Sequence, residues 1–158
     1  MYQKILIPTD GSEFSNTAAQ SGVEFAQQLN AEVVGVYVAP DYQYPIYVEI
    51  IPPSYPSEEE YKASMRQAGE SYLQTIQKSA EAAGLKFTGL IEFADTPAKN
   101  IAHAAQENHC DLIFMGSHGR GGWGQLILGS VTSKVLSLCD IPVLVYRAGK
   151  SSAKTSTV

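Results

Sequence analysis

The sequence near its beginning reads Ile5-Leu6-Ile7-Pro8-Thr9-Asp10-Gly11-Ser12. Three consecutive apolar residues favour a buried strand, and the polar residues after them are typical of a turn followed by a helix N-cap. Apolar residues then recur at helical spacing between Ala18 and Leu29, and residues 33–38 form a second, continuously apolar and largely β-branched run. This stretch therefore predicts a β-α-β unit.

The rest of the chain repeats the same alternation. Ser57-Glu58-Glu59-Glu60 is a capping box before a long helix that suits an end at Gly84, and Thr96-Pro97 places an N-cap and a first-turn proline before another helix. The further predicted strands are 87–93, 111–115 and 141–146, and the last predicted helix is 130–138. Parallel strands need helical crossovers, so the order βαβαβαβαβ predicts an α/β fold, a single doubly wound five-stranded parallel sheet with helices on both faces.

Two segments lie outside this alternation. Residues 40–56 hold five of the eight prolines and four tyrosines, so we expect a long loop there, and one hypothesis is that it closes as a lid over a ligand. The residues after Arg147 are rich in Ser, Thr and Lys, which predicts a disordered tail over 148–158. Residues 1–147 are expected to form one domain.

Composition narrows the class of protein. A chain of 158 residues with 44% apolar and 17% charged residues is typical of one soluble globular domain. The net charge of −5 argues against a nucleic-acid partner, and no apolar run approaches the ~20 residues of a membrane span. Cys110 and Cys139 lack the spacing of a disulfide framework or zinc site, so we expect buried reduced thiols and a cytoplasmic location.

Candidate binding residues follow from the predicted sheet. Ligands of open α/β sheets bind at the carboxyl ends of the strands, which indicates Pro8-Thr9-Asp10, Val38-Ala39 and the stretch from Gly116 to Ser130. Five glycines within residues 116–124 allow the backbone to approach a ligand, and Gly129-Ser130-Val131-Thr132 opens a helix whose unpaired N–H groups suit phosphate. The alternative is a flexible glycine loop with Ser130 as a simple N-cap.

The glycine spacing resembles a known family. Gly116-x2-Gly119-x9-Gly129-Ser130 reproduces the G-x2-G-x9-G-[S/T] signature of the ATP-binding branch of the universal stress protein family. Residues 115–119 are similar to the end of that family's fourth strand, and the likeness continues through residues 5–12 and 141–145. The resemblance therefore covers nearly the whole chain.

The resemblance implies a role for particular residues. It implies that Asp10 contacts the ribose or an associated Mg²⁺ and that the backbone at Val38 meets the adenine edge. The residues implied to hold the phosphates are Gly116, Gly119, Gly129, Ser130, Val131 and Thr132, with Met115 beside them. Asp10 has an alternative as a turn or cap residue, and Arg120 either contacts phosphate oxygens or is solvated. The resemblance also implies a homodimer formed through the last strand, Val143 to Tyr146.

Three functions remain open at this point. The favoured one is a stress-response regulator that binds ATP or another adenine nucleotide, and the alternatives are a slow ATP-hydrolysing or adenylyl-transferring enzyme and a dimeric interaction module without nucleotide. The G-x-G-x-x-G match at residues 119–124 follows the wrong strand for a dinucleotide fingerprint. Ser117-His118 suggests nucleophilic catalysis, but adjacent side chains rarely face each other, so no catalytic residue is predicted.

Overall fold

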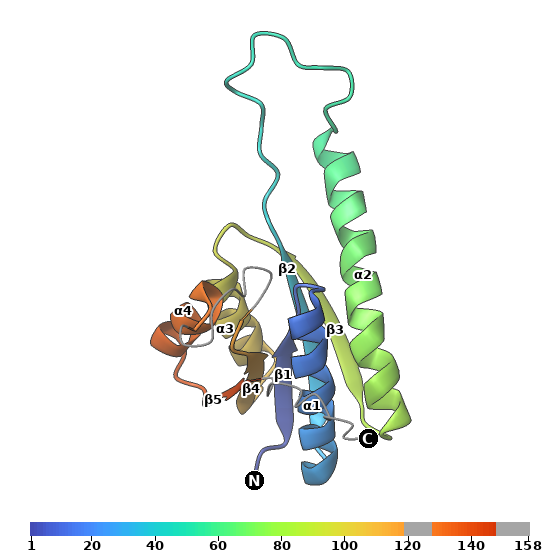
Figure 1. Ribbon diagram of the computed structural model, residues 1–158, viewed down its shortest axis with the longest axis vertical. Helices are drawn as coiled ribbons and strands as arrows, with labels where there is room; N and C mark the ends of the chain where they lie inside the picture. Colours follow the sequence, from blue (N-terminus) through green and yellow to red (C-terminus); the bar gives the residue numbers. More distant parts are fainter. Residues whose placement is uncertain (119–127, 148–158) are drawn as a thin grey trace, which may run out of the picture.

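Five parallel strands form one sheet in the order β3-β2-β1-β4-β5 (Figure 1). The computed structural model describes residues 1–118 and 128–147. The strands are β1 (Lys4–Pro8), β2 (Glu32–Ala39), β3 (Phe87–Phe93), β4 (Leu112–Gly116) and β5 (Val143–Tyr146). The strand order reverses between β1 and β4, which confirms the predicted doubly wound α/β sheet. β5 begins two residues later than predicted, because Pro142 has no N–H to give to a ladder.

Two helices cover each face of the sheet. α1 (Glu13–Leu29) and α2 (Glu58–Ala82) pack on one face, and α3 (Pro97–Glu107) and α4 (Ser130–Leu138) pack on the other (Figure 1). Successive residues of β1 point to opposite faces, so Ile5 and Ile7 join the α1–α2 core while Leu6 joins the α3–α4 core. All three side chains are at most 1% exposed, which makes β1 the centre of the molecule.

α1 and α2 begin at a residue whose side chain caps the helix, whereas no described side chain caps α3 or α4. The Ser12 hydroxyl accepts a hydrogen bond from Ser15 N at 3.2 Å at the start of α1, and the predicted capping box of α2 is present, with Glu60 N donating to Ser57 Oγ and Ser57 N donating to Glu60 Oε2. Thr96 occupies the predicted N-cap position of α3, but its side chain caps no N–H of the described chain. The N-cap of α4 is Gly129 rather than Ser130, and no side chain of the described residues caps this start.

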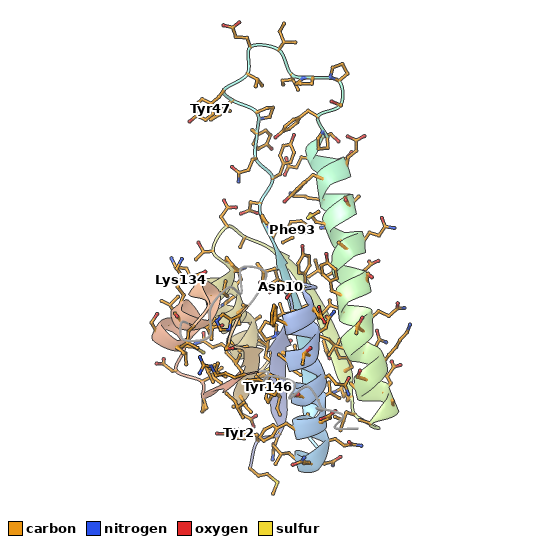
Figure 2. The ribbon with its side chains drawn as sticks, in the orientation of Figure 1. Tyr2, Asp10, Tyr47, Phe93, Lys134 and Tyr146 are labelled. Atoms are coloured by element: carbon orange, nitrogen blue, oxygen red, sulfur yellow. The ribbon has the colours of Figure 1, made fainter. Side chains whose placement is uncertain are left out.

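Residues 40–56, here called the arm, extend past the start of α2 and away from the sheet (Figure 1). All of these residues are described, and none lies in a helix or strand, as predicted. Tyrosines hold the base of the arm together: Tyr42 Oη donates to Pro56 O at 2.8 Å and Tyr55 Oη donates to Gln43 O at 2.7 Å. Tyr47 lies at the far end (Figure 2).

The two thiols differ in burial. Cys110 is buried, and desolvation raises the pKa of its thiol to about 11, so it stays protonated and inert. Cys139 is half-buried, which is less than the sequence led us to expect. Among residues 1–118 and 128–147, no helix has the length and apolar character needed to cross a membrane.

Candidate functional site

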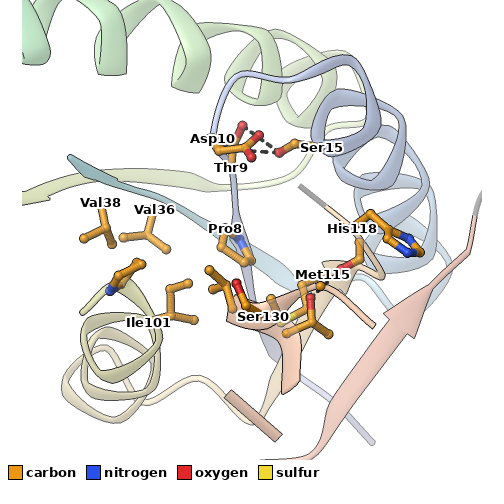
Figure 3. A pocket seen from close by; sticks show the side chains of 15 residues that line it. Pro8, Thr9, Asp10, Ser15, Val36, Val38, Ile101, Met115, His118 and Ser130 are labelled. Atoms are coloured by element: carbon orange, nitrogen blue, oxygen red, sulfur yellow. Dashed lines mark hydrogen bonds between the residues drawn. The ribbon is translucent and has the colours of Figure 1, made fainter. Parts of the chain in front are cut away.

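A cavity of about 440 Å³ opens at the carboxyl ends of β1, β2 and β4 (Figure 3). It lies where the strand order reverses, so the crossovers on either side leave on opposite faces and open a crevice between them. The predicted residues that line it are Pro8, Thr9, Asp10, Val38, Met115, Gly116, Gly129, Ser130, Val131 and Thr132. Gly119 and Arg120, also predicted, lie outside the described residues.

Five lining residues escaped the sequence analysis: Ser15, Val36, Pro97, Ile101 and His118. Ile101 stands one turn into α3, and Val36 stands two residues before the predicted Val38. The apolar periodicity of these segments predicts burial, and it does not separate a residue that faces a cavity from one that faces the core. Pro97, at the first position of α3, was recognised only as a helix-start signal.

One half of the cavity is apolar. Val36, Val38 and Ile101 present aliphatic side chains from β2 and α3 close together (Figure 3), and the apolar Met115 of β4 and Val131 of α4 also line the cavity. A flat, weakly polar ring is the kind of group that such a wall accepts.

The backbone of Val38 adds a donor and an acceptor to this half. In the described chain, Pro8 and Val36 are the last residues paired between β1 and β2, and Thr9 N still donates to Val36 O at 2.9 Å. β2 then continues to Ala39 without a partner on that side. Alternate residues of a strand direct their N–H and C=O to the same side, so Val38 directs both groups toward the side where β1 has already ended. One N–H and one C=O of the same residue therefore face the cavity.

The other half is polar and begins with the turn after β1. Ser15 Oγ accepts from Asp10 N at 3.2 Å and donates to Thr9 Oγ1 at 3.0 Å (Figure 3). The Asp10 carboxylate accepts from Ser12 N at 2.9 Å, so Asp10 is a turn residue, as the alternative interpretation held, and also lines the cavity. Gly11 has φ +77°, and a side chain there would collide with the ring of Tyr72.

The start of α4 completes the polar half. The backbone enters the helix through Gly129, whose N–H donates to Ser117 O at 2.7 Å, and Thr132 Oγ1 donates to Gly116 O at 2.9 Å. These bonds tie the helix to the end of β4. The first N–H groups of a helix lack intrahelical acceptors and carry partial positive charge, which suits an anion, and Ser130 and Val131 of this first turn line the cavity.

Ser117 and His118 do face each other, contrary to expectation. Ser117 Oγ lies 2.9 Å from His118 Nδ1, because the chain turns sharply at the end of β4. Ser117 is only 6% exposed and is not among the residues that line the cavity, whereas His118 is. In the described part of the chain, the buried Ser117 hydroxyl therefore holds the histidine ring and does not itself line the cavity. His118 Nε2 is buried and has no hydrogen-bond partner in the described chain.

Metal ligands are sparse at the site. Within the described residues no group of three His, Cys, Asp or Glu side chains is placed to hold a metal ion, and Asp10 is the one carboxylate among the described lining residues. The arm contributes none of the described lining residues and extends away from the crevice in Figure 1, so the lid hypothesis gains no support.

Known proteins share this architecture. The model of the universal stress protein family matches residues 1–147. The universal stress protein MJ0531 of Methanocaldococcus jannaschii is 34% identical over 155 residues, which cover 95% of this chain and 85% of that protein. The solved structure of the hypothetical protein MJ0577 superposes with a TM-score of 0.78 at 30% identity, over 96% of this chain and 99% of the other. A universal stress protein in complex with cAMP superposes with a TM-score of 0.64 at 21% identity, over 92% and 97% of the two chains.

Proposed function

Because this chain belongs to the universal stress protein family, we propose that it is a stress-response regulator that binds an adenine nucleotide, ATP, in the cavity beside β1, β2 and β4. One observation carries the proposal. Val38, with its backbone donor and acceptor, and the start of α4, which no described side chain caps, line the same cavity. These are the features that a nucleobase and a phosphate chain require at the two ends of one ligand.

The base end fits adenine. The Val38 N–H donates to a ring nitrogen of adenine, and the Val38 C=O accepts from the exocyclic amino group, which gives a pair of bonds with the right polarity. Val36, Ile101 and Met115 cover the faces of the ring. The related universal stress protein that superposes at 21% identity was solved in complex with cAMP, which supports an adenine nucleotide as the ligand class.

The phosphate end uses backbone rather than side-chain charge. The N–H groups of Ser130 and Val131 bind phosphate oxygens, and Gly116 and Gly129 allow a close approach because they carry no Cβ. Asp10 binds the ribose hydroxyls or a Mg²⁺ ion that the phosphates share, a coordination that needs only one or two protein carboxylates. For Gly119 and the neighbouring Arg120, the support for a place in this site comes only from the sequence, through the glycine signature.

We further propose that β5 pairs with β5 of a second copy to form a homodimer. β5 is an edge strand, and its residues Val143 to Tyr146 are all half-buried in the single chain. An unpaired apolar edge invites pairing. The substitution Val145→Lys should then halve the mass measured by sedimentation, and a wild-type protein that sediments as a monomer at all concentrations would exclude this dimer.

The test of the nucleotide site is isothermal titration of ATP with Mg²⁺ into protein first shown to be nucleotide-free. We expect micromolar binding in the wild type and a loss of roughly 100-fold in Gly129→Asp/Ser130→Ala, because a carboxylate about 5 Å from a phosphate repels it by several kcal/mol at an effective dielectric constant of 20. The matched control is Ser57→Ala, which alters a helix start far from the cavity. Folded wild type that binds neither ATP, ADP, AMP nor cAMP would favour the nucleotide-independent module.

A turnover enzyme is the second candidate. The described part of the cavity offers Asp10 and His118 as its titratable side chains, and the Nδ1 of His118 is already engaged with Ser117. Slow release of ADP or AMP from saturated protein, abolished in the Gly129→Asp/Ser130→Ala variant, would support this alternative.

A further inference from the structure

β3 leaves one side of its backbone unpaired. It is an edge strand, and no strand of the described chain pairs with it except β2 (Figure 1). At one end of this pairing Val33 N donates to Lys86 O at 2.9 Å, and at the other end Ala94 N donates to Ala39 O at 2.9 Å. Alternate residues of a strand direct their N–H and C=O groups to the same side, so the even-numbered residues from 86 to 94 direct these groups to β2. The residues that direct them to the open edge are Phe87, Gly89, Ile91 and Phe93.

α2 carries a polar stripe along this open edge. Four exposed side chains of α2 are separated by four, seven and four positions, which places them on one side of the helix. The polar stripe consists of Arg66, Glu70, Gln77 and Glu81. Glu70 and Gln77 line a hollow of about 580 Å³ between α2 and β3. Gln77 Nε2 donates to Glu81 Oε1 at 2.7 Å, and the guanidinium carbon of Arg66 lies 5.6 Å from the centre of the Phe93 ring. The polar stripe therefore runs beside β3.

We propose that β3 of one copy pairs with β3 of a second copy, antiparallel and about a two-fold axis beside Gly89. Gly89 then faces Gly89 of the second copy, and Phe87 faces Ile91 of the second copy, so their outward N–H and C=O groups bond each other. Backbone hydrogen bonds hold the partner strand, so the contact does not require an apolar edge. β5 lies at the opposite edge of the sheet, and both contacts can form in one assembly.

This register brings opposite charges together along the strands. Lys86 of one copy faces Glu92 of the second copy, and the two-fold axis repeats this pair. Opposite charges at facing positions of antiparallel strands stabilise the pairing, whereas like charges destabilise it. Lys86 Nζ lies 3.1 Å from Glu32 Oε1 in its own chain, and the Lys86 side chain is still 69% exposed. It therefore has access to a second carboxylate across the edge.

The position of α2 fits this pairing. Strands of a sheet lie about 4.8 Å apart, and α2 packs equally over β2 and β3, so its axis lies about half a spacing inside β3. The two-fold axis lies half a spacing outside β3. The two α2 helices are then about 9.6 Å apart, within the roughly 8–10 Å between packed helices. Leu73 lies over Gly89, because a Cβ on that glycine would be 3.5 Å from the Leu73 side chain, so the two-fold axis passes α2 beside Leu73.

The polar stripe is complementary to itself about this axis. Arg66 faces Glu81 of the second copy, and each such pair forms twice. Glu70 faces the amide of Gln77 of the second copy, so no carboxylate of the stripe faces another carboxylate. The charged pairs enclose about 22 Å of α2 at 1.5 Å per residue and about 20 Å of β3 at 3.3 Å per residue. The two layers match in length as well as in charge, which favours a second copy over an unrelated strand as the partner.

Charge reversal on the polar stripe tests the pairing. All proteins carry Val145→Lys, which removes association through β5, and sedimentation equilibrium measures the dissociation constant of the remaining dimer. Arg66→Glu places two carboxylates at each contact, so association should weaken tenfold or more. Arg66→Glu/Glu81→Arg restores the attraction and should return to within about threefold of the parent protein.

The matched control is Lys78→Glu, which makes the same change of charge at an exposed position of α2 outside the polar stripe. It should alter the dissociation constant by less than about twofold, and circular dichroism checks that every variant is folded. A Val145→Lys protein that stays monomeric at all concentrations, or a double variant that associates as weakly as Arg66→Glu, would overturn the proposal.

Amide exchange measured by NMR locates the contact without altering β3 or α2. In Val145→Lys protein the amides of Gly89 and Ile91 should exchange at least tenfold more slowly at concentrations where the dimer dominates than where the monomer dominates. The amides of Thr88 and Leu90 donate to β2 in both states, so their rates should change by less than about threefold. Equal changes in the two sets, or no change at Gly89 and Ile91, would exclude pairing through β3.

Discussion

α2 and α4 begin in opposite ways. At the start of α2, Ser57 and Glu60 bond each other's backbone, and three glutamates occupy the first turn. At the start of α4 the N-cap is Gly129, no described side chain caps the helix, and the first turn holds no acidic residue. The start of α2 faces the arm, and the start of α4 faces the cavity.

We interpret this difference as a loss of local stability at the start of α4 that serves the binding of an anion there. A capping box satisfies two N–H groups and complements the helix dipole, so the start of α2 is complete without a ligand. Within residues 1–118 and 128–147 the start of α4 lacks both devices, which under the proposed function leaves its N–H groups and positive potential for an anion. If this interpretation is right, capping α4 should cost binding, and uncapping α2 should cost stability alone.

The largest effect is expected from Gly129→Asp. The backbone at Gly129 has φ −57° and ψ 151°, which any residue adopts, so an aspartate there caps α4 as Ser57 caps α2. Affinity for ATP measured by titration should fall about 100-fold through charge repulsion, while the melting temperature should not fall. Gly129→Asn adds a neutral cap and should lose much less affinity. Equal losses for the two variants would show that crowding rather than charge governs the site.

The second effect concerns the bond that joins α4 to β4. Thr132 is 3% exposed, and its hydroxyl donates to Gly116 O at 2.9 Å. Thr132→Val should lower the free energy of unfolding by about 1–2 kcal/mol, because the partly buried Gly116 carbonyl loses its partner, and should weaken ATP binding several-fold by loosening the helix start. Urea denaturation and titration measure the two quantities. Thr132→Ser keeps the hydroxyl and should recover most of both, and failure to do so would assign the effect to packing of the methyl group.

The fold was predictable because its signals are local. Apolar runs such as Ile5-Leu6-Ile7 and the capping box at Ser57 depend on neighbours within a few residues, and the strict alternation of strands and helices then leaves little choice of topology. The end of α2 at Ala82 followed by Gly84 with φ +75° was predictable for the same reason.

The site was predictable only in part. Residues directly after strands, such as Asp10 and Gly116, are indicated by topology alone, whereas Ile101 and Ser15 enter the cavity through the angle at which their helices pack. The contact between Ser117 and His118 depends on a turn after β4 that has no marker in the sequence. The exposed tip of the arm was recognised as a loop, but its protrusion depends on how the tyrosines at its base pack against α2.

The third effect is expected from removing the N-cap side chain of α2, the reverse of adding one to α4. Ser57→Ala removes the hydroxyl that accepts from Glu60 N at 3.2 Å. The free energy of unfolding should fall by about 1 kcal/mol, which corresponds to a melting temperature about 2–4 °C lower for a chain of this size. ATP affinity should stay within about twofold of wild type, since the cap lies far from the cavity. Ser57→Thr retains a hydroxyl and should be nearly neutral. A large loss of affinity in Ser57→Ala would mean that the two helix starts are coupled and would break the comparison.

The smallest effect separates the charge of the capping box from its hydrogen bonds. Hydrogen bonds from Ser57, first from its backbone and then from its side chain, lower the pKa of the Glu60 carboxyl below 4.5. A lowered folded-state pKa means that the stabilisation is present above about pH 4.5 and is lost as the pH falls through the folded-state value. Glu60→Gln keeps the reach of the side chain without the charge, so it should be less stable than wild type at pH 7, and this difference should shrink toward pH 3. Thermal unfolding of both proteins across this range measures it.

Because Glu58, whose pKa is also lowered, titrates in both proteins, its contribution cancels in the difference. A difference that stays constant from pH 7 to pH 3 would mean that the carboxylate charge adds nothing to the start of α2, and the contrast with α4 would then rest on hydrogen bonding alone.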